Sequence, residues 1–124
     1  MATILVVDDE PPMREVLQAF LVTQDHTVFT AAGGEEALDL CHTYQDEIDV
    51  MITDLSMPGI NGIQLAMLVK AIRPRIHVVF ASAVPQTDPV GQEGLPEDAV
   101  FIKKPFSLST VGTTIQAMLA SDEP

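Results

Sequence analysis

Short apolar runs without polar alternation recur along this chain of 124 residues. The first run, Thr3–Val7, is rich in β-branched residues and is apolar throughout after its threonine. A strand of this composition is buried on both faces, which is typical of a parallel sheet covered by helices on both sides. Similar runs lie at residues 49–53, 76–81 and 99–103, and a weaker one lies at 27–31.

The segments between these runs carry apolar residues at helical spacing. Pro11 and Pro12 can begin the first helix because early helical positions need no backbone donor. Asn61 and Ser107 are expected to cap two later helices. The expected buried stripes are Met13, Val16, Leu17, Phe20 and Leu21; Ala37, Leu40, Cys41 and Tyr44; Leu65, Leu68, Val69 and Ile72; and Leu108, Val111, Ile115, Met118 and Leu119.

Strands that alternate with helices predict an α/β fold, with a doubly wound five-stranded parallel sheet and helices on both faces. Residues 84–98 depart from the pattern, because three prolines and two glycines interrupt them. We expect this segment to be mostly a mobile loop, with at best a short or irregular fourth helix. The chain has no internal repeat or linker, so residues 1–124 are expected to form a single domain with a frayed tail at 121–124.

Composition excludes several classes of function. Eighteen acidic and six basic residues give a net charge of −12, so direct contact with nucleic acid or with an anionic membrane surface is not expected. The one cysteine can form neither an internal disulfide nor a thiolate zinc cluster. The three histidines lack the spacing of metal ligands. No apolar run is long enough to span a membrane and no signal sequence is present, so a cytoplasmic location is expected.

Polar residues end four of the five expected strands. Asp8 and Asp9 follow the first, Asp54 the third and Ser82 the fourth, while Lys103 and Lys104 close the fifth. Parallel strands bring these ends to one edge of the sheet, where three carboxylates repel one another unless a cation lies among them. Mg²⁺ is the expected cation, since it takes carboxylate and phosphate oxygens. Such a cluster suits phosphoryl transfer, with an aspartate as the acceptor.

In this setting the chain resembles the response regulator receiver domains of bacterial two-component signalling (the CheY-like superfamily). The resemblance extends from residue 4 to about residue 119, and each motif that carries it lies at a strand end. These motifs are Leu-Val-Val-Asp-Asp-Glu at 5–10, Asp-Leu-Ser-Met-Pro-Gly-Ile-Asn-Gly at 54–62, Ala-Ser-Ala at 81–83 and Phe-Ile-Lys-Lys-Pro-Phe at 101–106. The family resemblance implies the flavodoxin-like strand order 2-1-3-4-5.

The resemblance also implies roles at the site. Asp54 would accept a phosphoryl group from a phosphohistidine on a sensor histidine kinase or phosphotransfer protein, or from a small phosphodonor. Asp9 would bind Mg²⁺ directly and Asp8 through water, with Asp54 and the backbone carbonyl of Ser56 as further ligands. Lys104 would pair with the phosphoryl oxygens, ahead of Pro105, whose preceding peptide is often cis in the family.

The remaining implied roles concern the switch. Ser82 would turn toward the phosphoryl group and Phe101 would follow it inward. This would change the surface formed by residues 84–98, the fifth strand and the last helix, and that surface would control an output domain or protein that the sequence does not identify. Phe101 stands where tyrosine is more frequent, and Lys103 where an apolar residue is usual.

Each feature also has a simpler interpretation. The acidic run could be only the first turn of a helix, Ser82 could merely end a strand, Phe101 could be only a core aromatic, and Lys103 fits a solvated edge charge.

A Mg²⁺-dependent aspartyl-phosphate phosphohydrolase usually has a second aspartate where this chain has Ser56. A flavin-binding module would need a phosphate-binding loop where this chain has acidic residues. A degenerate receiver used only for protein binding would not need the complete acidic and lysine set. We therefore expect a phospho-accepting signalling domain rather than an enzyme that turns over a separate substrate.

Overall fold

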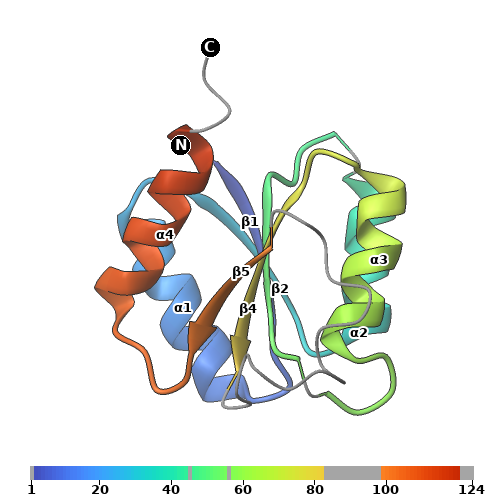
Figure 1. The fold of residues 1–124 in the computed structure, drawn as a ribbon, viewed down its shortest axis with the longest axis horizontal. Coiled ribbons are helices and arrows are strands. Elements are labelled where there is room, and N and C mark those ends of the chain that lie inside the picture. The colour runs from blue at the N-terminus through green and yellow to red at the C-terminus, as the bar shows by residue number, and fades with distance from the viewer. Residues whose placement is uncertain (1, 45, 56, 83–98, 121–124) are drawn as a thin grey trace.

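The structure is a computed structural model that describes residues 2–44, 46–55, 57–82 and 99–120 (Figure 1). For Ser82 it describes the backbone but not the side chain. The expectations for residues 84–98, for the tail at 121–124 and for Ser56 lie outside the described residues. The strands are β1 (Thr3–Val7), β2 (Thr27–Ala31), β3 (Val50–Thr53), β4 (His77–Ser82) and β5 (Val100–Lys103). The helices are α1 (Pro11–Thr23), α2 (Gly34–Thr43), α3 (Gly62–Ile72) and α4 (Leu108–Ala120).

The five strands form one parallel sheet in the order β2-β1-β3-β4-β5, which confirms the predicted topology. In this order β3 is the central strand, and β1 lies between β2 and β3. Val7, the last residue of β1, pairs with Ala31 of β2 and with Thr53 of β3. The residues that follow β1 and β3 therefore leave the sheet side by side.

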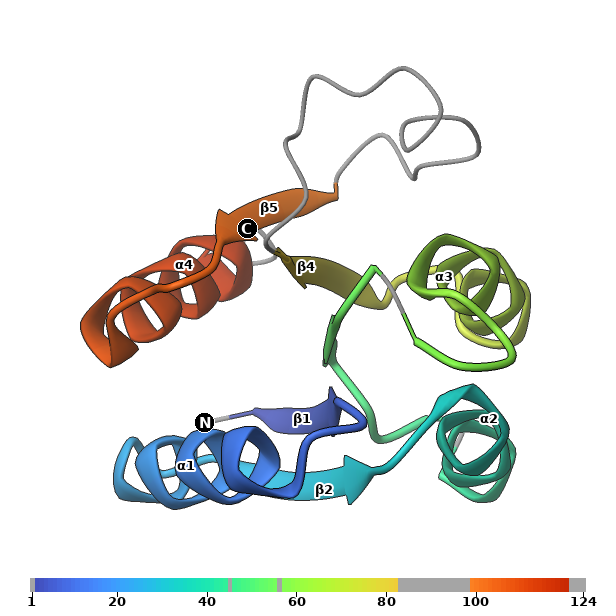
Figure 2. The same cartoon turned by 90° about the horizontal axis from the view of Figure 1, so that it is seen from below.

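Helices cover both faces of the sheet. Figures 1 and 2 show α1 and α4 on one face and α2 and α3 on the other. Leu17, Leu21 and Ile115 fill the core beneath α1 and α4, while Leu65 and Phe80 are among the fully buried residues of the other core. Burial of the sheet on both sides explains why β1, β3 and most of β4 are apolar without alternation.

Both predicted caps and the proline start are present. The side chain of Asn61 accepts a hydrogen bond from the Gln64 N–H, and the Gln64 side chain accepts one from the Asn61 N–H, which forms a capping box. The Ser107 hydroxyl accepts a hydrogen bond from the Thr110 N–H at the start of α4. Pro11 is the first residue of α1. These local signals fix where α1, α3 and α4 begin.

Some details of the sequence analysis were wrong. Three strands begin one residue later than expected, at positions 50, 77 and 100. Val16 is 48% exposed and Leu68 is 46% exposed, although both were assigned to buried stripes. Each lies about one helical step, roughly 100°, from the centre of the arc that its helix buries. The remaining stripe residues are buried or half-buried.

Candidate functional site

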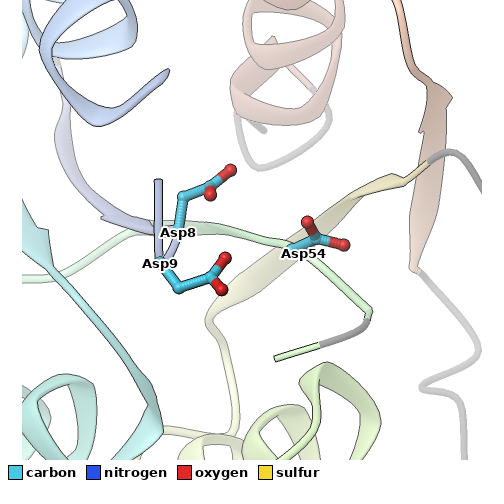
Figure 3. A group of neighbouring side chains, drawn as sticks. All are labelled: Asp8, Asp9 and Asp54. Carbon is cyan, nitrogen blue, oxygen red and sulfur yellow. The ribbon is translucent and has the colours of Figure 1, made fainter. Parts of the chain in front are cut away.

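Three carboxylates meet where β1 and β3 leave the sheet. Asp8 and Asp9 follow β1 directly, and Asp54 follows β3. The adjacent backbones are linked, since the Asp54 N–H donates to the Val7 carbonyl over 3.4 Å. One carboxylate oxygen from each aspartate lies within 4.8 Å of the others, and Figure 3 shows the three groups around one space. The sequence prediction that these residues converge is correct.

Asp8 is the most enclosed member of the group, with a residue exposure of 3%. Its Oδ1 accepts the Glu10 N–H over 2.9 Å, and its Oδ2 lies 3.2 Å from the Lys104 ammonium. Its own N–H donates to the Ala31 carbonyl over 3.2 Å. Asp9, by contrast, is exposed, and Asp54 is intermediate. The cluster therefore runs from a fixed, buried carboxylate to an open one.

Lys104 reaches the same cluster from the far edge of the sheet. Its Nζ lies 3.0 Å from Asp54 Oδ2 as well as 3.2 Å from Asp8 Oδ2. Burial lowers the pKa of Lys104, but the hydrogen bonds that Lys104 donates to Asp54 and Asp8 and the charges of both carboxylates outweigh burial and raise the pKa above its ordinary value. The ammonium is thus held fully charged. The adjacent Lys103 is exposed, as alternation along the strand predicts.

The backbone around Asp54 is tightly enclosed by the start of α3. A side-chain carbon added at Gly62 would lie 2.1 Å from the Asp54 carbonyl oxygen, so only glycine fits there. The Gly62 N–H donates to the Leu55 carbonyl over 2.9 Å. The buried Thr53 hydroxyl donates to the Asp54 carbonyl over 3.1 Å. These contacts fix the turn that carries the Asp54 carboxylate.

The arrangement suits a small hard cation together with a phosphoryl group. Carboxylate oxygens are the ligands that Mg²⁺ prefers, and one or two carboxylates, water and phosphate commonly complete its sphere. One face of the group is exposed through Asp9, so an ion and its waters can enter. Lys104 supplies a positive charge beside Asp8 and Asp54. The residues present therefore fit a divalent cation.

The other predicted residues stand as follows. Ser82 ends β4, paired with Lys103 of β5, and its side chain is outside the described part of the structure. Phe101 is half-buried, and its ring centroid lies 5.3 Å from that of Phe80 at a tilt of 30°. This contact agrees with a core aromatic and does not test a switch. The Lys104–Pro105 peptide is cis, as the resemblance implied.

The sequence analysis did not identify Arg14 as part of the site. Its Nη1 donates a 2.6 Å hydrogen bond to the carbonyl oxygen of Asp8. One signal was available in the sequence, because Arg14 is the single lysine or arginine before Lys70. That isolation in an acidic stretch could have singled the residue out.

Comparison with known proteins identifies the family. Residues 4–116 match the model for the response regulator receiver domain. The chain belongs to the response regulator receiver domain family. Over 98% of its length, the receiver is 33% identical to a segment of the sensor kinase CckA of Brucella abortus, and that segment makes up 13% of CckA. The alternatives of a phosphohydrolase, or of a degenerate receiver used only for protein binding, are not favoured.

Solved structures agree with this assignment. A receiver domain protein from Clostridium thermocellum superimposes with a TM-score of 0.86 at 26% identity, covering 98% of this chain and 96% of that one. The response regulator TrrA from Thermotoga maritima, solved in complex with Mg²⁺–BeF, gives a TM-score of 0.79 at 28% identity, covering 95% of this chain and 99% of that one. Receiver domains are phospho-accepting signalling modules that bind Mg²⁺ at an acidic cluster and work with histidine kinases or phosphotransfer proteins.

Two further findings bound the assignment. The receiver spans between 13% and 47% of the length of the first curated relatives it matches. Within the described residues, no helix combines the length and the apolar character needed to cross a membrane.

Proposed function

We propose that Asp54 of this receiver accepts a phosphoryl group, in a Mg²⁺-dependent transfer, from a phosphohistidine on a partner kinase or phosphotransfer protein. One observation carries the proposal: the Asp54 carboxylate lies both within the aspartate cluster and 3.0 Å from the Lys104 ammonium. The Asp54 side chain is also more accessible than that of Asp8, at 13% against 5%. An incoming phosphorus atom can therefore reach Asp54 more easily.

The transfer forms one bond and breaks one. An oxygen of the Asp54 carboxylate attacks phosphorus and forms an acyl phosphate, while the bond from phosphorus to the donor's imidazole nitrogen breaks. The electron pair of the broken bond stays on that nitrogen, which is protonated from solvent. Lys104 lies on the Asp54 carboxylate and neutralises part of the charge that collects on the phosphoryl oxygens.

The cation would be held by the carboxylates of Asp8, Asp9 and Asp54 and by the backbone carbonyl of Ser56. When bound, Mg²⁺ offsets the repulsion between these carboxylates and the phosphoryl group. Asp8 is suited to a supporting role, since its carboxylate already accepts the Glu10 N–H and pairs with Lys104. Asp9 is open to solvent, which suits direct contact with a hydrated ion.

The signal would pass from Asp54 to the edge of the sheet. Phosphorylation adds about −1.5 to −2 charges, which would draw the Ser82 hydroxyl toward the phosphoryl oxygens and let Phe101 move inward. Support comes from the sheet order, because β4 lies between β3, which Asp54 follows, and the edge strand β5. The surface that would change comprises residues 84–98, β5 and α4. It would control an output domain or protein, and the domain itself would act in the cytoplasm without touching nucleic acid or membrane.

The decisive experiment uses intact mass. The wild-type chain is mixed with Mg²⁺ and a small phosphodonor such as acetyl phosphate, and we expect a gain equal to one phosphoryl group. Asp54→Asn should show no gain, while Asp39→Asn, a matched change on the exposed side of α2, should show the full gain. Chelating Mg²⁺ should stop the reaction in every variant. An undiminished gain in Asp54→Asn would refute the assignment.

A second measurement tests the coupling to the partner. Lys104→Ala should remain folded, as circular dichroism would report, but phosphorylation should no longer change the affinity for an output partner. Lys103→Ala removes the same charge from the exposed side of the strand end and should leave coupling intact. Equal coupling in both variants would contradict the role given to Lys104.

A further inference from the structure

Arg14 occupies an unusual place in the charge pattern. It is the single lysine or arginine among the first 69 residues, a stretch that carries twelve acidic residues. It lies in the first turn of α1 and is half-buried. Its Nη1 donates to the Asp8 carbonyl oxygen over 2.6 Å, a short distance that is typical of a charged donor. The side chain thus turns back from the helix onto the residue where the acidic cluster begins.

The accepting carbonyl belongs to the peptide that joins Asp8 to Asp9. Because a peptide unit is planar, the direction of this carbonyl also sets the positions of the Asp9 N–H and Cα. In the described part of the chain, no hydrogen bond or ion pair holds the Asp9 carboxylate itself. The orientation of this exposed carboxylate therefore depends on the backbone to which Arg14 is hydrogen-bonded.

Among the described residues, the hydrogen bond from Arg14 to Asp8 is one of the few side-chain contacts at the start of α1. Its N-cap residue, Glu10, makes no side-chain capping bond, and the prolines at 11–12 have no N–H to donate. The Glu10 N–H bond to Asp8 Oδ1 and the Arg14 bond to the Asp8 carbonyl both connect this end of the helix to Asp8. Buried Leu17 fixes α1 against the sheet. Because α1 is held against the sheet, the hydrogen bond from Arg14 can hold the peptide between Asp8 and Asp9 in a fixed orientation relative to the helix.

We propose that Arg14 is a positioning residue for the divalent-cation site of this receiver. It orients the Asp8–Asp9 peptide so that the Asp9 carboxylate faces those of Asp8 and Asp54, and it contacts neither the ion nor the phosphoryl group. The inference rests on the proposed function. It requires that loss of the Arg14 hydrogen bond weakens Mg²⁺ binding and leaves the transfer rate at saturating Mg²⁺ unchanged.

The first test measures Mg²⁺ binding alone, by titration calorimetry without a phosphodonor. Arg14→Met keeps most of the apolar stem and removes the donor, and we expect its dissociation constant for Mg²⁺ to rise about tenfold, as for other groups that orient metal ligands. The matched control is Arg75→Met, which removes the same charge from an exposed position just before β4. The control should bind Mg²⁺ as the wild type does. Equal affinities in the two variants would overturn the inference.

The second test separates positioning from a purely structural role. In Arg14→Met, the Mg²⁺ concentration for half-maximal phosphorylation should rise by the same factor, while the rate at saturating Mg²⁺ should match that of Arg75→Met. A reduced maximal rate with unaltered Mg²⁺ affinity would overturn the inference. Arg14→Lys keeps a charged donor at the end of a shorter side chain, so the Mg²⁺ affinity of this variant should lie between those of the wild type and Arg14→Met.

Arg14→Lys also decides the matter if Arg14→Met does not fold, because wild-type affinity in a folded Arg14→Lys would then contradict the need for the guanidinium. A different result would refute the proposed function. A wild-type chain that binds Mg²⁺ but gains no phosphoryl mass would refute the role of Asp54, and the calorimetric comparison would still decide the role of Arg14.

Discussion

The Nζ atom of Lys104 lies 3.0 Å from Oδ2 of Asp54, although fifty residues separate them along the chain. The two residues leave strands β5 and β3, which are not neighbours, since β4 runs between them. The long side chain of Lys104 therefore crosses the end of β4, and its ammonium contacts Asp8 as well. A single positive charge therefore lies between the carboxylates of Asp8 and Asp54.

Replacing Lys104 by methionine should destabilise the receiver when Mg²⁺ is absent. The Asp8 side chain, 5% exposed, would lose its ion pair and face Asp54 without a positive charge between them. Breaking such a pair leaves an uncompensated carboxylate, and we expect a loss of about 2 kcal/mol in the free energy of unfolding. Lys103→Met, at the exposed neighbouring position, should change it by less than about 0.5 kcal/mol. Urea unfolding of the two variants checks the difference, and equal losses would contradict it.

Mg²⁺ should stabilise the folded receiver through Asp9. An ion that binds only the native state, at ten times its dissociation constant, adds about 1.4 kcal/mol to the free energy of unfolding. Asp9→Asn should lose most of this gain without an initial folding cost, because its carboxylate is exposed. Asp39→Asn should keep the gain. Thermal unfolding with Mg²⁺ is compared with a potassium salt of equal ionic strength, since screening alone stabilises a chain of charge −12. The same Mg²⁺ response in both variants would contradict the predicted site.

The parts of the fold that the sequence predicted well are those set by local rules. Asp8, Asp54 and Lys104 were expected together because parallel strands end at one edge, and the structure brings them together. Val16 and Leu68 were misassigned because apolar spacing gives the period of a helix but not the centre of its buried arc, which depends on what packs against it. Arg14 was missed because a side chain that binds a backbone carbonyl leaves no recognisable motif, and its isolation in an acidic stretch does not by itself indicate what it contacts.

Gly62→Ala should disturb Asp54 directly. The added carbon would lie 2.1 Å from the Asp54 carbonyl oxygen and 2.9 Å from the Leu55 Cα, and both neighbours are backbone atoms that cannot rotate away. We expect a loss of about 3 kcal/mol in the free energy of unfolding and a lower rate of phosphoryl acceptance. Gly33→Ala is the matched control, because its added carbon meets nothing within 4 Å. If the phosphorylation rates of the two folded variants were equal, the turn after β3 would not be positioning Asp54.

Cys41 should react slowly with thiol reagents while the receiver is folded. Burial raises the pKa of the Cys41 thiol from 9.0 to about 11, so the reactive thiolate is about 100-fold scarcer than in the unfolded chain at pH 8. The modification rate, measured with and without denaturant, should differ by at least that factor, and no other cysteine contributes to the signal. A native rate equal to the denatured rate would mean that α2 opens readily.

The same shift in the pKa of Cys41 gives a pH dependence with a definite sign. Between pH 9 and about 11 the unfolded thiol loses its proton while the folded thiol keeps it, so the native state binds more protons and its stability falls as pH rises. Below pH 9 both forms are protonated and the contribution is fully present. Cys41→Ala removes the group, so its stability should fall less steeply over this interval than that of the wild type. Parallel curves would show that the thiol ionises equally in both states, which is incompatible with its burial between α2 and the sheet.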